Sequence, residues 1–154
     1  MPAEFRQLKQ KDEFIAAYEL IKLQQPTLSE AEYWRLLGEM MFAGQLFAGL
    51  YLQNTLIGVV GIRKGADWLY GEHLWLHILI LAPNYREQGY EKMLLDFVLE
   101  WAKAQDCEHI YSTLDLATVQ GTAAGFVTSG QLFTLNLNTE KPALFTSGNK
   151  LPNS

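Results

Sequence analysis

Apolar and polar residues alternate along the first third of the chain in a way that predicts a short extended start and two helices. Glu4–Leu8 is the extended segment. From Asp12 apolar side chains recur at helical spacing, and Pro26 ends this helix because proline disfavours helical geometry in the residue before it. Thr27–Glu30 has the form of a capping box, which predicts a second helix from there to Gly44.

Two strand-like runs follow, Gln45–Leu52 and Thr55–Arg63. The residues between them, Gln53 and Asn54, suit a tight hairpin because asparagine tolerates left-handed backbone. We therefore expect an antiparallel ribbon. The next segment, Lys64–Glu72, contains two glycines and is predicted to be a loop.

The middle of the chain predicts a strand, a helix and a second strand. Leu74–Ala82 is almost wholly apolar, as in a central strand that is buried on both faces, and Pro83 ends it. Arg86–Ala104 has the clearest helical periodicity in the chain. Glu108–Leu116 is again strand-like. A strand that follows a strand–helix unit favours a parallel neighbour, joined by a right-handed crossover.

The last third predicts a weaker helix over Thr118–Ser129 and closing strands at Gln131–Asn138 and Ala143–Thr146. Together these elements indicate an α/β fold: a mixed central sheet with one parallel strand pair, flanked by helices. With no repeat or linker in the pattern, we expect one domain over residues 1–148 and a C-terminal tail at 149–154.

Composition narrows the class of protein. The chain of 154 residues is 49% hydrophobic and 19% charged, which is typical of a soluble globular protein. With a net charge of -5, the chain lacks the overall positive charge that is typical of proteins that bind nucleic acid or an anionic membrane surface. No apolar run approaches the roughly 20 residues that span a bilayer. Cys107 is the only cysteine, so a cytoplasmic setting is expected and the thiol is a core filler. The three histidines lack ligand spacing, and we expect no metal.

The segment from Pro83 to Lys92 carries the clearest chemistry, because it joins the buried strand to the long helix. The first backbone N–H groups of a helix have no partner inside it and favour anions. Gly89 permits positive φ or the close approach of a phosphate, and Arg86 adds a guanidinium suited to phosphate oxygens. The pattern therefore predicts an anion pocket.

Pro83, Arg86, Gly89 and Leu94–Leu95 resemble the pyrophosphate loop of the GNAT N-acetyltransferase family. That loop reads Arg/Gln-x-x-Gly-x-Gly/Ala, with a proline three residues before it and Leu-Leu after it. The order of the elements is also similar to the family's across nearly the whole chain.

The resemblance implies the GNAT acyl-CoA N-acyltransferase fold, in which the parallel strand pair is splayed. It also implies acetyl-CoA as the co-substrate, with its pantetheine arm along Leu79, Ile80 and Leu81. The pyrophosphate would then bind Arg86, Glu87, Gln88, Gly89, Tyr90, Glu91 and Lys92.

Two departures from the family pattern lie in the loop itself. Glu91 stands where the family has glycine or alanine, and Glu87 where glycine is usual. A carboxylate about 4 Å from a phosphate charge opposes binding by about 1 kcal/mol in water and about 4 kcal/mol at an effective dielectric near 20. Arg86 and Lys92 offset part of this repulsion.

A third departure concerns the general acid. The family commonly has a tyrosine beside a phenylalanine in its last helix, where the hydroxyl protonates the departing thiolate. Here Phe126 is followed by Val127, which has no proton to donate. Tyr111, Tyr90 or water would have to replace it.

His77 is the candidate general base. It is the one titratable group in the apolar strand, and its ordinary pKa near 6.5 suits removal of a proton from an ammonium group. The alternative is a histidine hydrogen-bonded within the core. Glu72, His73 and Asp115 are weaker candidates for the base.

The expected function is transfer of an acetyl group from acetyl-CoA to an amine by direct attack in a ternary complex. The acceptor would be a small-molecule or peptide amine. A second hypothesis is a catalytically impaired protein of the same fold that binds coenzyme A or a partner, and a third is a ligand module without coenzyme.

The acceptor cleft would lie between the two N-terminal helices and the final strands. Aromatic residues suggest a wall for it, although helical spacing places Tyr18 and Trp34 in the core; the residues are Tyr18, Tyr33, Trp34, Trp68, Tyr70 and Trp75. An exposed closing strand near Leu132–Leu137 would allow a homodimer by strand pairing.

Overall fold

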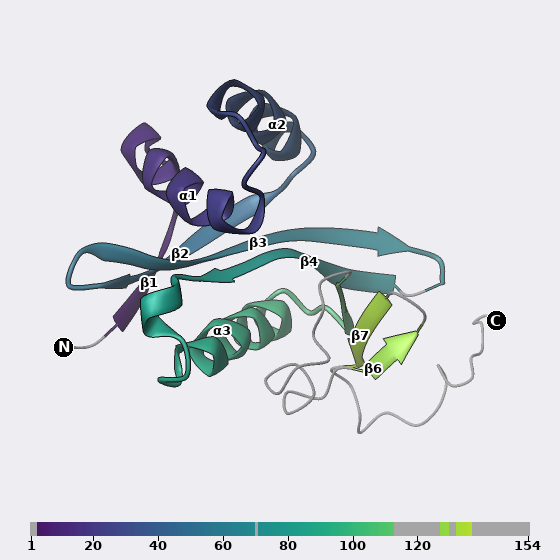
Figure 1. The fold of residues 1–154 in the computed structure, drawn as a ribbon. Helices are drawn as coiled ribbons and strands as arrows, with labels where there is room; N and C mark the ends of the chain where they lie inside the picture. The colour runs from purple at the N-terminus through teal and green to yellow at the C-terminus, as the bar shows by residue number, and fades with distance from the viewer. Residues whose placement is uncertain (1–2, 70, 113–126, 130–131, 137–154) are drawn as a thin grey trace.

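The computed structural model describes residues 3–69, 71–112, 127–129 and 132–136 (Figure 1). Its helices are α1 (Lys11–Gln24), α2 (Glu30–Phe42) and α3 (Tyr90–Ala104), with a short 3-10 turn, η1, at Pro83–Tyr85. Its strands are β1 (Ala3–Gln7), β2 (Leu46–Leu52), β3 (Thr55–Asp67), β4 (Gly71–Leu81), β5 (His109–Ser112), β6 (Val127–Ser129) and β7 (Leu132–Asn136).

The described strands form one mixed sheet in the order β1-β2-β3-β4-β5-β7-β6. Neighbours pair antiparallel except β4 and β5, which are parallel. In this pair Leu76 lies beside Ser112, and the Ser112 hydroxyl donates a 2.9 Å hydrogen bond to the Leu76 carbonyl. The predicted mixed sheet with a parallel pair is confirmed.

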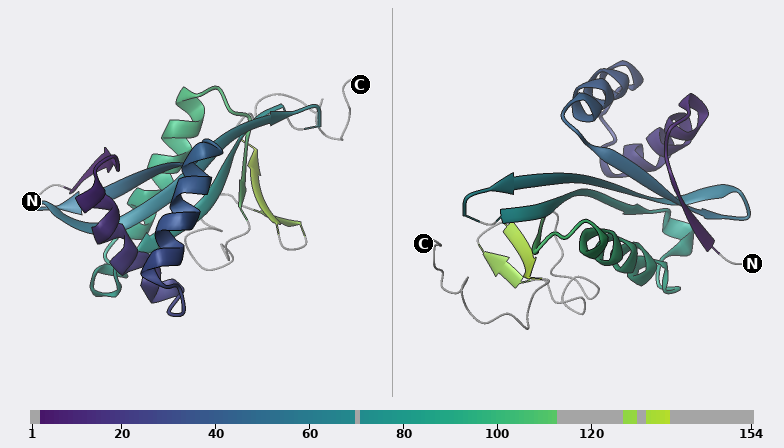
Figure 2. Two further views of the ribbon diagram at one scale, coloured as in Figure 1. Left: turned by 90° about the horizontal axis from the view of Figure 1, so that it is seen from above. Right: turned by 180° about the vertical axis from the view of Figure 1, so that it is seen from behind.

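Helices cover both faces of the sheet: α1 and α2 lie on one face and α3 on the other (Figures 1 and 2). Each face has its own apolar cluster. Leu94, Leu95 and Val98 of α3 belong to one, while Phe14 and Leu37 of the N-terminal helices belong to the other. In Figure 1 neither α1 nor α2 extends over the ends of β3 and β4 that are joined near residue 70.

Strand β4 contains a β-bulge at His77. Gly61 of β3 pairs with Ile78 and Ile62 pairs with Leu76, so His77 is an extra residue. The side-chain alternation shifts at this point. Leu74 and Leu76 before the bulge, and Leu79 and Leu81 after it, all pack in the α3 cluster, whereas Ile78 and Ile80 pack beneath α1 and α2. A bulge re-aims side chains, and here the pairing with β3 resumes at Ile78, so the residues that face each side of the sheet switch at the candidate base.

Local sequence signals explain several boundaries. Gln53 and Asn54 both have positive φ, 52° and 66°, and form the two-residue hairpin turn that the sequence predicts. The N-cap of α2 is Ser29, whose hydroxyl accepts the N–H of Glu32 at 3.1 Å. The capping box was therefore placed two residues too early at Thr27.

The prediction of a loop over Lys64–Glu72 is wrong. β3 runs to Asp67 and pairs with β4 as far as the Asp67–Gly71 pair. Gly65 does not break the strand, because it accommodates the ring of His73: a Cβ atom at Gly65 would lie only 2.8 Å from His73 Nε2. A glycine in a strand can mark close packing, and here it does.

The predicted start of the long helix at Arg86 is also wrong, since α3 begins at Tyr90. Pro83–Tyr85 form the 3-10 turn, and the backbone is left-handed at Glu87, φ 63°, and at Gly89, φ 92°. Left-handed residues are incompatible with a right-handed helix, so the segment 86–89 remains a loop.

Val127–Ser129 forms strand β6 instead of the end of a helix, which fits its β-branched valine and threonine. β7 lies between β5 and β6, so the strand near Leu132–Leu137 is not a sheet edge and does not support strand pairing between subunits. Tyr70, Asp115, Phe126, the strand at Ala143–Thr146 and the boundary at residue 148 lie outside the described residues.

Candidate active site

The loop between β4 and α3 is exposed and presents a helix start without a side-chain cap. Glu87, Gln88 and Gly89 are all exposed. Gly89 is the N-cap of α3, and no side chain bonds to the first turn from this position. The first backbone N–H groups of a helix have no intrahelical acceptor, so those from Tyr90 onward face the loop at the positive end of the helix. This geometry fits an anion.

Several polar side chains in and beside the loop contact neighbouring residues. The Glu91 carboxylate accepts the backbone N–H of Glu87 at 3.2 Å, and Lys92 Nζ pairs with Asp96 at 2.8 Å. Gln88 Nε2 donates to the Asn84 carbonyl at 2.9 Å. Arg86 is exposed and makes no ion pair with a described residue. Arg86 is thus the cation of this loop that is available to a ligand.

The second part of β4 has one edge without a partner in the described structure. Leu79, Ile80 and Leu81 pair with β3 on one side. On the other side the pairing with β5 ends at Leu76 and Ser112, and β5 is described only to Ser112. The backbone groups along this edge suit the amides of an extended arm.

His77 sits at the bulge and is partly exposed, with no hydrogen bond to a described residue. Its ring stacks on Trp75, with centroids 5.8 Å apart and planes 17° apart. Burial, and secondarily the positive charge of Arg63, hold the pKa of His77 below its ordinary value of 6.5. The imidazole is therefore neutral at pH 7 and able to accept a proton, unlike a histidine hydrogen-bonded within the core.

The two other described candidates for the base, His73 and Glu72, each contact a neighbouring residue. His73 is 4% exposed, and its Nδ1 lies 3.0 Å from the Gly71 carbonyl. Glu72 is exposed and pairs with Lys64 at 3.5 Å. Neither lies at the bulge, as His77 does.

The two tyrosines considered as general acids lie in different places. Tyr111 is buried on β5. Its ring centroid lies 5.4 Å from that of Trp75, the residue on which the His77 ring stacks. Tyr90 is in the first turn of α3 and contacts Tyr85, 6.0 Å away. Of the two, Tyr111 is nearer the strand that carries the candidate base.

The aromatic residues do not form one wall. Tyr18, Tyr33 and Trp34 contact one another in the packing of α1 and α2. Trp68 is 99% exposed near the β3–β4 turn. Among the described residues of this predicted aromatic wall, only Trp75 contacts His77.

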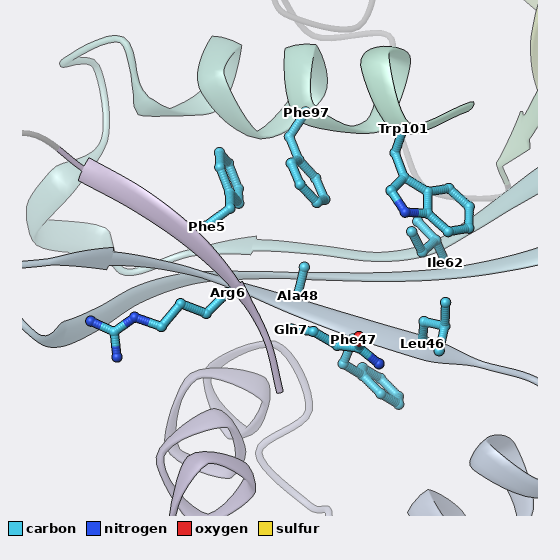
Figure 3. Close-up of a pocket in the computed structure, with 9 residues that line it drawn as sticks. All are labelled: Phe5, Arg6, Gln7, Leu46, Phe47, Ala48, Ile62, Phe97 and Trp101. Atoms are coloured by element: carbon cyan, nitrogen blue, oxygen red, sulfur yellow. The ribbon is translucent and has the colours of Figure 1, made fainter. Parts of the chain in front are cut away.

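Cavities flank the sheet on both faces. One, of about 80 Å³, is lined by residues of α1 and α2 and by Phe47 and Ile78 of the sheet, and Ile78 directly follows the bulge. The other, of about 90 Å³, is shown in Figure 3. Phe97 and Trp101 of α3 line it, and Phe5 of β1 stacks on Phe97 at 4.2 Å. It lies mainly on the α3 face, away from His77, so of these two cavities the first is the one that borders the candidate site.

Sequence reasoning missed two polar residues on the face of the sheet that carries His77. Arg63 lies opposite Trp75 in the β3–β4 register. Gln45 is buried at the start of β2, with its Nε2 atom next to Gly61. The sequence contained a signal for Arg63. Side chains alternate between the two faces along a strand, so Arg63 lies on the same face of β3 as its other odd-numbered residues.

The model of the Acetyltransferase (GNAT) family matches residues 10–127. The chain belongs to the GNAT family. A curated relative, the uncharacterized N-acetyltransferase YhdJ of Bacillus subtilis (strain 168), is 28% identical over 99 residues, which are 64% of this chain and 70% of that protein. GNAT membership thus rests on sequence as well as on topology.

Solved structures show the same GNAT fold. The PaiA N-acetyltransferase from Thermoplasma acidophilum, in complex with coenzyme A, superposes with a TM-score of 0.67 at 20% identity and covers 88% of this chain and 99% of that chain. Glucosamine-6-phosphate N-acetyltransferase from Arabidopsis thaliana gives 0.59 at 13% identity, covering 73% and 82%. At these identities the likeness concerns the fold.

Three further findings bear on this GNAT protein. Within the described ranges, no three or more His, Cys, Asp or Glu side chains are grouped to hold a metal ion. No helix in the part of the chain that the structure describes has the length and apolar character needed to cross a membrane. Cys107 is buried, which raises the pKa of its thiol and fits a packing role.

Proposed function

We propose that this protein is an acetyl-CoA-dependent N-acetyltransferase that transfers the acetyl group directly to an amine in a ternary complex. The observation that carries the proposal is the exposed, uncapped start of α3 at left-handed Gly89, directly after the central strand. Membership of the GNAT family supports it, since a GNAT fold with such a loop suits a coenzyme pyrophosphate.

The co-substrate is held in two places. Its pyrophosphate accepts hydrogen bonds from the backbone N–H groups of Gln88–Glu91, and Arg86 adds a charged donor. Its pantetheine amides pair with the edge of Leu79–Leu81 that has no partner among the described residues. The arm then leads along β4 towards the bulge, where His77 lies.

The reaction at the bulge needs a base, a nucleophile and a stabilised oxyanion. Neutral His77 takes a proton from the ammonium group of the acceptor, and the freed amine attacks the thioester carbonyl carbon. The carbonyl oxygen gains negative charge and accepts a hydrogen bond from a backbone N–H of β4. The C–S bond then breaks, and the thiolate takes a proton from Tyr111 or from water. The nitrogen of the new amide releases its second proton, which restores that donor. Positioning of the two substrates supplies much of the rate.

Calorimetry with acetyl-CoA and coenzyme A tests the first half of the proposal, and a free-thiol assay with a panel of small-molecule and peptide amines tests the second. We expect saturable binding, and turnover that falls by two to four orders of magnitude in His77→Ala. Absence of binding at millimolar acetyl-CoA would contradict the proposal, and so would turnover that is equal in the variant.

A second candidate is a protein of this fold that binds coenzyme A but no longer catalyses transfer. Val127 favours it, because the family commonly has a tyrosine at this position and valine has no proton to donate to the departing thiolate. The same assays separate the two: binding without turnover on any amine supports the second candidate.

A further inference from the structure

The face of the sheet beside His77 carries three side chains from neighbouring segments. Arg63 of β3 pairs with Trp75 of β4, and Leu46, the first residue of β2, pairs with Ile62, so Gln45, which directly precedes β2, lies near Arg63. Gln45 and Phe47 share a face by strand alternation, and Phe47 packs beneath α1 and α2. The row Gln45, Arg63, Trp75 therefore leads across the sheet to His77, which stacks on Trp75.

Arg63 is a half-buried cation without a carboxylate partner among the described residues. Asp67 is the next acidic residue on this face of β3. It lies four residues further along the strand, about 13 Å away at the usual rise, and is 3.9 Å from His73. Withdrawing a charge from water is unfavourable unless it is paired, so the guanidinium suits an anionic group supplied from outside.

Gln45 adds a donor beside Gly61, which lies two residues from Arg63 on the same face of β3. The residue is 4% exposed, and its Nε2 has no hydrogen-bond partner in the described structure. Nε2 and Ile78 Cβ both lie 3.1 Å from the position that a Cβ atom on Gly61 would occupy, so the amide sits beside Ile78. An unsatisfied buried donor in a native structure calls for an acceptor, such as an oxygen atom of a ligand.

Ile78 connects these polar groups to the cavity beneath α1 and α2. The cavity is lined almost entirely by hydrocarbon, including Phe14, Leu37, Met40 and Phe47. Its volume of about 80 Å³ is roughly half that of a cavity known to hold a benzene ring. The space therefore suits a branched aliphatic group better than an aromatic one.

We propose that the acceptor is an aliphatic α-amino acid, whose carboxylate binds Arg63 and Gln45 while its side chain enters the cavity and its amine reaches His77. This inference rests on the proposed function and names the substrate class of the same site. Arg63 and His77 are near-diagonal neighbours across β3 and β4, and such residues are roughly 7–8 Å apart. An α-amino acid carries its amine and carboxylate on one carbon, so it can contact both residues.

Four amines that differ by one group each test the proposal. They are L-leucine, L-leucinamide, which lacks the carboxylate charge, 3-methylbutylamine, which lacks the carboxylate, and glycine, which lacks the side chain. We expect kcat/KM for leucine to exceed that of each of the others by roughly tenfold to a hundredfold, the range both of a hydrogen bond to a charged group and of a buried aliphatic side chain. Equal or faster turnover of L-leucinamide and 3-methylbutylamine, the two analogues without a carboxylate charge, would overturn the proposal.

Variants link this preference to the two residues. In Arg63→Gln the advantage of leucine over leucinamide should disappear, whereas Arg35→Gln, an exposed arginine of α2 that pairs with Glu32 and Glu39, should keep it. Gln45→Leu should raise the KM for leucine without loss of thermal stability, because it removes a donor that has no partner. An unchanged KM in Gln45→Leu would assign that residue a packing role and overturn its place in the site.

A binding measurement separates failure of this inference from failure of the proposed function. Calorimetry with the intact protein and coenzyme A should show saturable binding of leucine that Arg63→Gln weakens by at least tenfold. If no amine is acetylated but leucine binds in this way, the catalytic proposal fails and the ligand class stands. If polyamines or other amines without a carboxylate turn over independently of Arg63, the ligand class fails and catalysis stands.

Discussion

The carboxylate of Glu91 accepts a hydrogen bond from the backbone N–H of Glu87 at 3.2 Å, across the loop that joins β4 to α3. Glu87 has left-handed backbone, φ 63°, and this turns its N–H towards the start of the helix. A carboxylate at this positive end is favourable for the isolated protein. The same donor region is where the proposed pyrophosphate binds, so Glu91 and the co-substrate compete for it.

Neutralising this carboxylate should therefore strengthen coenzyme binding. In Glu91→Gln we expect the Kd for coenzyme A to fall about fivefold to tenfold, because a like charge near the phosphates costs about 1 kcal/mol in a water-exposed loop. Calorimetry at low and high salt measures this. Glu100→Gln, an exposed position further along α3, is the matched control and should leave Kd unchanged. Equal or weaker binding in Glu91→Gln would show that the carboxylate does not oppose the ligand.

Gly89 offers a second test, because the chain contains a matched glycine. Gly89 directly precedes α3 and Gly44 follows α2, and their φ values are 92° and 99°. A Cβ atom at either position would meet nothing within 4 Å. Alanine at either site should cost about 1–2 kcal/mol in the free energy of unfolding, since an L residue is strained there. Only Gly89→Ala should also weaken coenzyme A binding, because its new methyl group lies in the proposed phosphate loop.

Urea unfolding of both variants, with calorimetry on each, separates the two effects. Equal losses of stability with unequal losses of coenzyme affinity are the expected result. Equal affinities in the two variants would remove Gly89 from the proposed site.

Tyr33 holds the two N-terminal helices together. Its hydroxyl donates a 2.6 Å hydrogen bond to the Phe14 carbonyl of α1, and burial raises the pKa of Tyr33 to about 12. Tyr33→Phe should lower the free energy of unfolding by about 1 kcal/mol, the usual net value of such a bond. Chemical denaturation at pH 7 measures it.

The raised pKa of Tyr33 also predicts a pH dependence. An unfolded tyrosine ionises near pH 10 while folded Tyr33 keeps its proton, so the wild type loses stability as pH rises from 10 towards 12. Tyr33→Phe should lose less stability over this range. A parallel decline in the two proteins would contradict the assignment.

Periodicity predicted the elements that bury apolar faces. α1, α2, the Gln53–Asn54 hairpin and the parallel pair β4–β5 were all predicted, because a helix or strand with one apolar face leaves a clear pattern. The errors fall where long-range pairing decides the structure. The exposed end of β3, as far as Asp67, is a strand because β4 pairs with it. From the sequence alone Gly65 predicts a break in the strand, whereas in the structure it makes room for the His73 ring.

The loop could be located in the sequence, but its details could not. Pro83, Arg86 and Gly89 mark the position, whereas left-handed Glu87 and its contact with Glu91 depend on the loop's three-dimensional path. His77 was predicted as the titratable group of the central strand. Its bulge follows from the offset between β3 and β4, and its nearness to Arg63 from their register, which a single sequence does not contain.

The neutral state of His77 makes a prediction about the pH dependence of acetyl transfer. Burial and the charge of Arg63 lower the pKa of His77 below 6.5, and a general base acts in its unprotonated form. At saturating acetyl-CoA, kcat/KM for the amine reports the ionisation of the enzyme before the amine binds, so it should rise as pH increases through a pKa below 6.5 and be level at pH 7. Removing the positive charge in Arg63→Gln should raise this pKa and move the rising limb to higher pH. His77→Gln should lose the limb and most of the rate, while Lys64→Gln, which removes a neighbouring charge from the opposite face of β3, should keep the wild-type limb. A limb that persists in His77→Gln would assign the titration to another group, and His77 would then not be the base.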